Sequence, residues 1–225
     1  MINVVPVSTK KQLATFIDFP HDLFADDPNY VPELFIAQRD VLTPGKHPFH
    51  EHSSLQCFLA IDENKKIKGR IAAILNRNHN SFNHANDGFF GFFDCVNDTT
   101  VAKALFEEAT KWLKAKGVAS IIGPANPSTN ETVGLLIDGF DRPPVAMMTY
   151  NKPYYSKLIE EQGLHKKVDL FAYELTQDTV SDRAVKLQEA IQKRLEQKHV
   201  TIRPINVKDF KNEVSKVREI YNSAW

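Results

Sequence analysis

The sequence has few cysteines, no surplus of either charge and no long apolar run. Its 28 Lys and Arg residues balance 28 Asp and Glu residues, so the formal net charge is zero. A protein that binds nucleic acid through its phosphates needs a basic surplus to release counterions, so we do not expect that class. No segment approaches the roughly 18 consecutive apolar residues of a membrane span, and we expect no stable membrane insertion.

The two cysteines, Cys57 and Cys95, lie in apolar runs that resemble strands. A reduced, buried thiol is more common there than a disulfide or a zinc ligand. The first residues lack the basic segment and the apolar stretch of about 7–15 residues that mark a secretion signal, so we expect a cytoplasmic protein. Hydrophobic residues make up 42% of the chain, which is enough for a sizeable core.

The residues before position 100 predict antiparallel strands around a loop-rich insertion. Between residues 26 and 54 the chain is interrupted by prolines, and such a long connection is a candidate for function. Two apolar runs separated by DENKK indicate a hairpin. The expected strands are 2–8, 55–61, 67–75 and the phenylalanine-rich 88–96, and the expected helices are 10–24 and 33–42.

After residue 97, strands alternate with helices. Asp98 or a neighbouring threonine is expected to cap a helix whose apolar stripe runs from Ala102 to Leu113, and Gly117 ends it. The further strands expected are 118–122, 145–150 and 168–175, and the further helices are 132–138 and 153–162. This order predicts the α/β (α+β) class, a mixed sheet flanked by helices.

The C-terminal part predicts a second unit. A polar helix at 181–199 is expected to connect it, and VTIRPINVKDF from Val200 repeats the opening pattern, with Pro204 placed as Pro6 is. We therefore expect a first domain at 1–178, a connecting helix at 179–199 and the truncated start of a second, similar half at 200–225. The alternative is a C-terminal hairpin and helix that belong to the first domain, because a repeat needs periodicity over more than one element.

Several segments carry a family resemblance. HPFHEH, RIAAILNRNHN, GFFGFF, GPANPSTNE and GFDRPPVAMMTYNKPYY cover Pro48 to Tyr155 and are similar to segments of a bacterial branch of GNAT-like N-acetyltransferases whose members carry two such halves. The resemblance implies a GNAT-like fold, with a central strand that splays from its neighbour. It also implies acyl transfer from coenzyme A to an amine.

The resemblance places coenzyme A at the end of the phenylalanine-rich strand and the start of the next helix. There, exposed peptide groups hold the pantetheine arm and a helix N-terminus holds the pyrophosphate. Thr100 replaces a family glycine, and Asp98 puts a negative charge where phosphate oxygens are expected. The predicted cofactor-binding residues are Cys95, Val96, Asn97, Thr100, Val101 and Ala102.

Acyl transfer needs a base for the amine and an acid for the departing thiolate. Asp94 is the predicted base; the alternative is a strand-end cap for the next helix. In the family, a tyrosine acts as the general acid that protonates the thiolate. The equivalent positions here fall near Ile137 and at Ile159, and isoleucine cannot donate a proton. Tyr150 and Tyr155, with the adjacent tyrosine at 154, are the predicted substitutes, unless they are core residues with tethered hydroxyls.

The segment GPANPSTNE concentrates amides and a carboxylate that suit a polar acceptor. The predicted substrate-binding residues are Asn126, Ser128, Asn130 and Glu131. A turn that bonds to its own backbone would look the same, and Glu131 can instead belong to a capping box. The histidines of HPFHEH favour structural or acceptor contacts over a metal site, and no metal is expected.

These observations predict an acyl-CoA-dependent N-acyltransferase that moves an acetyl or longer acyl group to a small-molecule or lipid-like amine acceptor. A homodimer is a further expectation. The alternative from another class is a non-catalytic GNAT-like module that braces a catalytic second half or binds a partner. A third alternative, transfer from aminoacyl-tRNA, needs a basic groove and is disfavoured by the zero net charge.

Overall fold

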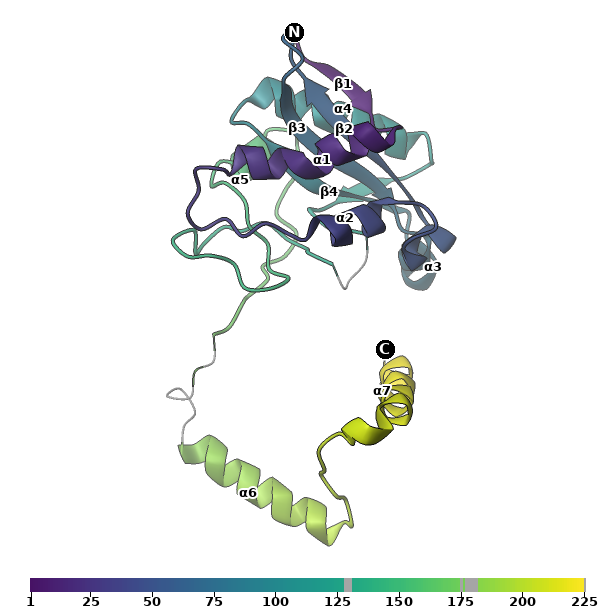
Figure 1. Ribbon diagram of the computed structural model, residues 1–225, viewed down its shortest axis with the longest axis vertical. Helices are drawn as coiled ribbons and strands as arrows, with labels where there is room; N and C mark the ends of the chain where they lie inside the picture. The colour runs from purple at the N-terminus through teal and green to yellow at the C-terminus, as the bar shows by residue number, and fades with distance from the viewer. Residues whose placement is uncertain (128–130, 175, 177–181, 225) are drawn as a thin grey trace. The chain divides into compact units, whose positions relative to one another are not determined.

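The computed structural model describes residues 1–127, 131–174, 176 and 182–224. The chain divides into two compact units, Met1–Leu170 and Phe171–Trp225, which we call unit 1 and unit 2 (Figure 1). The domain boundaries expected from the sequence at 178 and 199 stay predictions.

Unit 1 is built on one five-stranded mixed sheet in the order β1-β2-β3-β4-β5. The first four strands pair antiparallel with their neighbours, and β5 runs parallel to β4. The strands are β1 (Asn3–Pro6), β2 (Ser54–Ile61), β3 (Ile67–Leu75), β4 (Asp87–Cys95) and β5 (Ser120–Ile122). The predicted fold class, a mixed sheet flanked by helices, is confirmed.

Helices cover both faces of the sheet, and Figure 1 shows α1 crossing its front. Side chains alternate along β2, so that Cys57 and Leu59 belong to one buried cluster while Phe58 and Ala60 belong to the other. The first cluster includes side chains of α1 and α2, and the second includes those of α4 and α5. The helices are α1 (Lys10–Leu23), α2 (Phe35–Leu42), α3 (Arg77–Asn83), α4 (Thr99–Lys114) and α5 (Tyr155–Glu160), with a 3-10 turn, η1, at Pro48–Glu51.

Capping explains where the two long helices begin. At α1, the Thr9 side chain accepts a hydrogen bond from the Gln12 backbone N–H, and the Gln12 side chain accepts one from the Thr9 backbone, which completes a capping box. At α4, Asp98 is the N-cap, and the predicted apolar stripe is buried against the sheet. The helix predicted from Asp98 to Gly117 is therefore confirmed.

Three predicted elements are wrong. Residues 132–138 form no helix, and neither 145–150 nor the described part of 168–175 forms a strand. In the first two segments, side chains rather than a partner strand form hydrogen bonds with the backbone. The Asn151 side chain bonds both the N–H and the C=O of Leu136, and Thr149 Oγ1 donates to the Gly134 carbonyl. Val168 and Leu170 are about two-thirds exposed, and no strand within the described ranges pairs with this part of the chain. The predicted polar turn after β3 instead contains α3, capped by Asn76.

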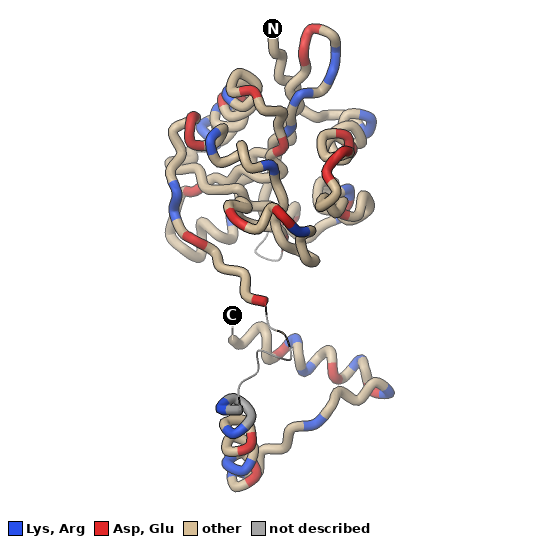
Figure 2. The backbone as a smooth tube through the Cα atoms, turned by 90° about the vertical axis from the view of Figure 1, so that its left-hand side faces the viewer, with Lys and Arg blue, Asp and Glu red and all other residues tan. Residues whose placement is uncertain are grey.

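Unit 2 contains two amphipathic helices, α6 (Asp182–Gln197) and α7 (Phe210–Ala224), and a 3-10 turn, η3 (Val207–Asp209). Residues 200–206 form no strand, so the expected repeat of the opening strand is not formed, whereas the helix expected after it is. Arg203 makes a two-pronged ion pair with Glu213 of α7. Figure 2 shows acidic and basic residues interspersed along α6 rather than gathered in one basic stripe.

Candidate functional site

The short strand β5 pairs over its whole length with the first three residues of the central strand β4. Paired positions run only from Asp87–Ser120 to Phe89–Ile122. Further along, the register between β3 and β4 shifts, and Phe92 has a φ of 47°, so β4 bulges at this point. Among the described residues, β4 therefore has no regular strand partner beyond Phe89 on the β5 side, at the place where the resemblance puts the splay.

The chain itself fills the first part of this splay. The Ala125 N–H donates to the Phe90 carbonyl at 2.8 Å, and the Phe92 N–H donates to Asn126 Oδ1 at 3.0 Å. The contact depends on glycine, because a Cβ placed on Gly91 would lie 2.4 Å from the Ala125 carbonyl oxygen. Asn126, predicted to bind substrate, is thus engaged by the backbone of β4.

A buried ion pair lies at the far end of β4. Arg70 Nε of β3 donates to Asp94 Oδ2 at 2.7 Å, and both residues are almost fully buried. Arg70 Nη1 also donates to the Phe16 carbonyl at 2.8 Å and to Gln38 Oε1 at 3.3 Å. The guanidinium carbon lies 4.9 Å from the centre of the Phe16 ring. Asp94 is therefore held as the partner of an arginine, and its predicted role as base stays a prediction.

The predicted tyrosines have tethered hydroxyls. Tyr155 Oη donates to Asp94 Oδ1 at 3.1 Å and accepts from the Cys95 N–H at 3.1 Å. Tyr154 Oη donates to the Cys95 carbonyl at 2.8 Å. Burial raises the pKa of Tyr154 to about 12 and that of Tyr155 well above its ordinary value. Both hydroxyls therefore hold their protons more tightly than an exposed tyrosine does.

In the predicted pyrophosphate loop, the N-cap residue Asp98 already binds a backbone N–H at the start of α4. The Asp98 side chain accepts from the Thr100 N–H at 2.8 Å and also from the Thr100 hydroxyl, and these bonds lower the pKa of Asp98. A carboxylate therefore lies at the N-terminus of α4, where it repels a second anion. Asn97 and Thr100 are exposed, whereas Val101 and Ala102 are buried. The Val96 N–H donates to the Lys68 carbonyl. These residues do not fit a coenzyme A pyrophosphate.

Glu131, another predicted substrate residue, lies beside the HPFHEH segment. Its Oε1 is 3.8 Å from His47 Nε2, and burial raises its pKa, while His47 opposes that rise. Because no helix follows Glu131, the capping-box alternative is wrong. Ser128 and Asn130 lie outside the described residues.

The other two histidines of HPFHEH have separate partners. His50 Nε2 lies 2.8 Å from the Val41 carbonyl oxygen, and His52 Nδ1 lies 2.6 Å from Ser53 Oγ. In the part of the chain that the structure describes, no group of three or more His, Cys, Asp or Glu side chains is arranged to hold a metal ion.

Sequence reasoning missed a polar contact that ties the loop-rich insertion to the segment before α5. Asp27 accepts hydrogen bonds from the Tyr150 hydroxyl at 2.9 Å and from Lys152 Nζ at 2.7 Å. The Asn29 side chain donates to the Phe140 carbonyl, which is a second link. Tyr150, predicted to be catalytic, is thus half of a structural contact. The sequence signal was the turn DDPN, in which the Asn29 N–H donates to Asp27 Oδ1.

Replacing Asp27 by asparagine is expected to lower the thermal midpoint of unit 1 at neutral pH. Burial raises the pKa of Asp27, but hydrogen bonds, first from Lys152 and then from Tyr150, outweigh it, so the pKa lies below its ordinary value. The carboxylate therefore contributes stability above about pH 4, and the contribution is lost as the pH falls through the lower, folded-state value. Thermal melts at several pH values should show the difference between wild type and D27N shrinking below about pH 4.

The neighbouring Asp26 is exposed, so Asp26→Asn is the matched control and should leave the midpoint unchanged. A D27N midpoint equal to that of wild type at pH 7 would contradict the assignment.

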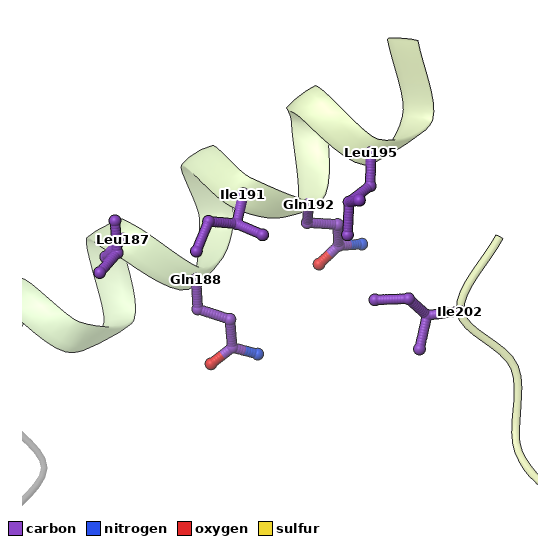
Figure 3. A pocket seen from close by; sticks show the side chains of 6 residues that line it. All are labelled: Leu187, Gln188, Ile191, Gln192, Leu195 and Ile202. Carbon is purple, nitrogen blue, oxygen red and sulfur yellow. The ribbon is translucent and has the colours of Figure 1, made fainter. Parts of the chain in front are cut away.

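Two surface pockets are present, and Asp94 lines neither of them. One, of about 290 Å³, lies in unit 2 and is formed by the apolar face of α6 together with Ile202 (Figure 3). Leu187 and Ile191, which line it, are about half exposed. The other, of about 210 Å³, is lined by residues 45–48, 50 and 51. Neither contains a predicted catalytic or cofactor-binding residue.

A five-stranded mixed sheet whose last strand runs parallel to β4, with helices on both faces, is the GNAT-like architecture that the resemblance predicted. Solved structures similar to the chain include a putative acetyl transferase from Pyrococcus furiosus (TM-score 0.44, 11% identity, 78% of this chain and 100% of that chain). Another is a tandem GNAT protein from the clavulanic acid biosynthesis pathway (TM-score 0.45, 10% identity, 74% of this chain and 45% of that chain). No protein-family model matches the chain.

Two curated proteins are similar to nearly the whole chain. Protein YghO of Escherichia coli K12 is 40% identical over 218 residues, which are 96% of this chain and 54% of that protein. The bacterial ceramide synthase of Caulobacter vibrioides is 36% identical over 228 residues, 100% of this chain and 58% of that protein. The chain thus spans little more than half the length of these relatives. No helix in the described ranges is long and apolar enough to cross a membrane.

Proposed function

We propose that the chain is part of an N-acyltransferase that moves a fatty acyl group from a thioester to a lipid-like amine. The observation that carries this proposal is the 36% identity to a bacterial ceramide synthase over the whole chain. A ceramide is the amide of a fatty acid and a long-chain amino alcohol, so its synthesis forms a bond between an acyl carbon and an amine nitrogen. Because the chain spans 58% of that relative, the activity is proposed for the whole natural protein that contains the chain.

The two reacting groups, the unprotonated amine and the thioester, are both neutral. The lone pair of the amine attacks the thioester carbonyl carbon, the C–N bond forms and the C–S bond breaks. The nitrogen loses a proton, and the departing thiolate takes one. We assign no proton transfer to Asp94, Tyr150 or Tyr155, since each is engaged by other groups of the chain. Acyl-CoA is the proposed thioester.

The whole natural protein, incubated with palmitoyl-CoA and sphinganine, is expected to form N-palmitoyl-sphinganine with release of one thiol per amide. Mass spectrometry measures the amide, and a chromogenic thiol reagent measures coenzyme A. The control acceptor is N-acetyl-sphinganine, whose nitrogen has no basic lone pair, and it should give neither signal. If no amide is formed with acetyl-, octanoyl- or palmitoyl-CoA and either sphinganine or a short alkylamine, the proposal fails.

A further inference from the structure

We infer that unit 1 does not hold the acyl thioester beside β4. Its own residues occupy that slot, where they fasten α5 and residues 123–126 to the sheet. The inference deepens the proposed function. It rests on that proposal because it assumes that the whole protein binds a thioester.

At the near end of the slot, the exposed edge of β4 is bonded by the segment that follows β5. The Phe90 carbonyl and the Phe92 N–H face the splay, and they are paired with Ala125 and Asn126. A Cβ on Gly123 would lie 2.4 Å from the Phe90 carbonyl oxygen, so the two backbones already touch. No ligand enters between them without moving the chain.

At the far end of the slot, two tyrosine hydroxyls bind the Cys95 peptide groups. One accepts from the Cys95 N–H and the other donates to the Cys95 carbonyl. The Tyr155 ring is 1% exposed and packs edge-on against Phe93 at 5.4 Å between ring centres. A pantetheine arm carries amide N–H and C=O groups, which would need these same peptide partners. Its entry would leave a buried hydroxyl unpaired, which is costly.

The start of α4 is closed to phosphate as well. The Asp98 carboxylate accepts from the Thr100 N–H, which is one of the donors that an anion would use. Thr99 is also engaged, since its hydroxyl donates to Glu161 Oε2 just after α5 at 2.6 Å. The bonds at Cys95 and at Thr99 therefore both fasten α5 and its end to the neighbouring elements. On this inference, the thioester of the proposed reaction binds outside the slot beside β4.

The first test is a titration of the isotope-labelled 225-residue chain with coenzyme A and octanoyl-CoA, followed by NMR. The amide signals of Phe92 and Cys95 report the two ends of the slot. They are expected to stay unshifted up to about 1 mM ligand, the upper end of the usual KM range for enzymes. A saturable shift of either signal would overturn the inference.

The second test measures whether the hydroxyls act as braces. Tyr154→Phe and Tyr155→Phe keep the rings but leave the Cys95 carbonyl and N–H unpaired, so each should lower the thermal midpoint by roughly 2–10 °C. Tyr173 is 84% exposed, and Tyr173→Phe is the matched control with no expected change. A Y155F midpoint within one degree of wild type would overturn the inference. A failed acyl-transfer assay of the whole protein would leave both measurements unaffected, so the two failures are distinguishable.

Discussion

Replacing Arg70 by methionine is expected to destabilise unit 1 by about 3–5 kcal/mol, the usual cost of breaking a buried ion pair from one side. Met has a similar length but no charge, so the Asp94 carboxylate would remain buried with only the Tyr155 hydroxyl as a side-chain partner. Typical domains are stable by about 5–15 kcal/mol, so this loss is a large fraction of the total. Urea unfolding followed by far-UV circular dichroism measures it.

Arg77 provides the matched control, because it is exposed, and Arg77→Met should cost less than about 0.5 kcal/mol. Removing both charges, in the double variant R70M and D94L, should recover part of the loss, since no charge is then left buried without its partner. An R70M protein within 1 kcal/mol of wild type would show that the pair does not stabilise the fold.

Replacing Gly91 by alanine is the second change with a large expected effect, a loss of about 3 kcal/mol from overpacking. The added Cβ would lie 2.4 Å from the Ala125 carbonyl oxygen and 2.7 Å from Asn126 Oδ1. The first of these atoms is backbone and cannot rotate away, so the segment after β5 has to lift from β4. Urea unfolding measures the loss of stability.

Gly88, on the same strand, is the control for this prediction. A Cβ there would meet the side-chain ends of Leu113 and Val118, which can shift, so Gly88→Ala should cost less. Equal losses in G91A and G88A would mean that the tight backbone contact does not determine the effect.

Elements with a strong local signal were predictable from the sequence. The hairpin of β2 and β3 follows from two apolar runs around a polar turn, and α4 follows from an apolar stripe with a cap at Asp98. The conformation of residues 134–151 was not predictable, because it depends on side chains such as that of Asn151. Its amide bonds the Leu136 N–H and C=O, which a neighbouring strand would otherwise bond. No local pattern distinguishes such an asparagine from a surface residue.

The candidate site was predictable only in part, for a similar reason. The sequence marks Asp94 as a polar residue near the end of an apolar strand, but its partner Arg70 lies 24 positions away and is brought to it by strand register. Lys152 and Asp27 are separated by 125 positions, and their contact depends on the tertiary fold. The sequence marks the tyrosines as candidates, and their catalytic role stays a prediction, whereas the contact of Tyr154 and Tyr155 with the Cys95 peptide becomes visible only in three dimensions.

The buried thiols that the sequence predicts are confirmed, since Cys57 and Cys95 are both buried and unbridged. Burial raises the pKa of each to about 12, so almost no thiolate is present at neutral pH. Alkylating reagents therefore reach these sulfurs only when the protein opens. The labelling rate of Cys57 reports opening of the β2–β3 hairpin, and that of Cys95 reports opening at the end of β4, where Tyr154 and Tyr155 bind. Comparing the labelling rates of the two native sulfurs would show, without an engineered cysteine, whether that end of β4 opens locally before the rest of the sheet.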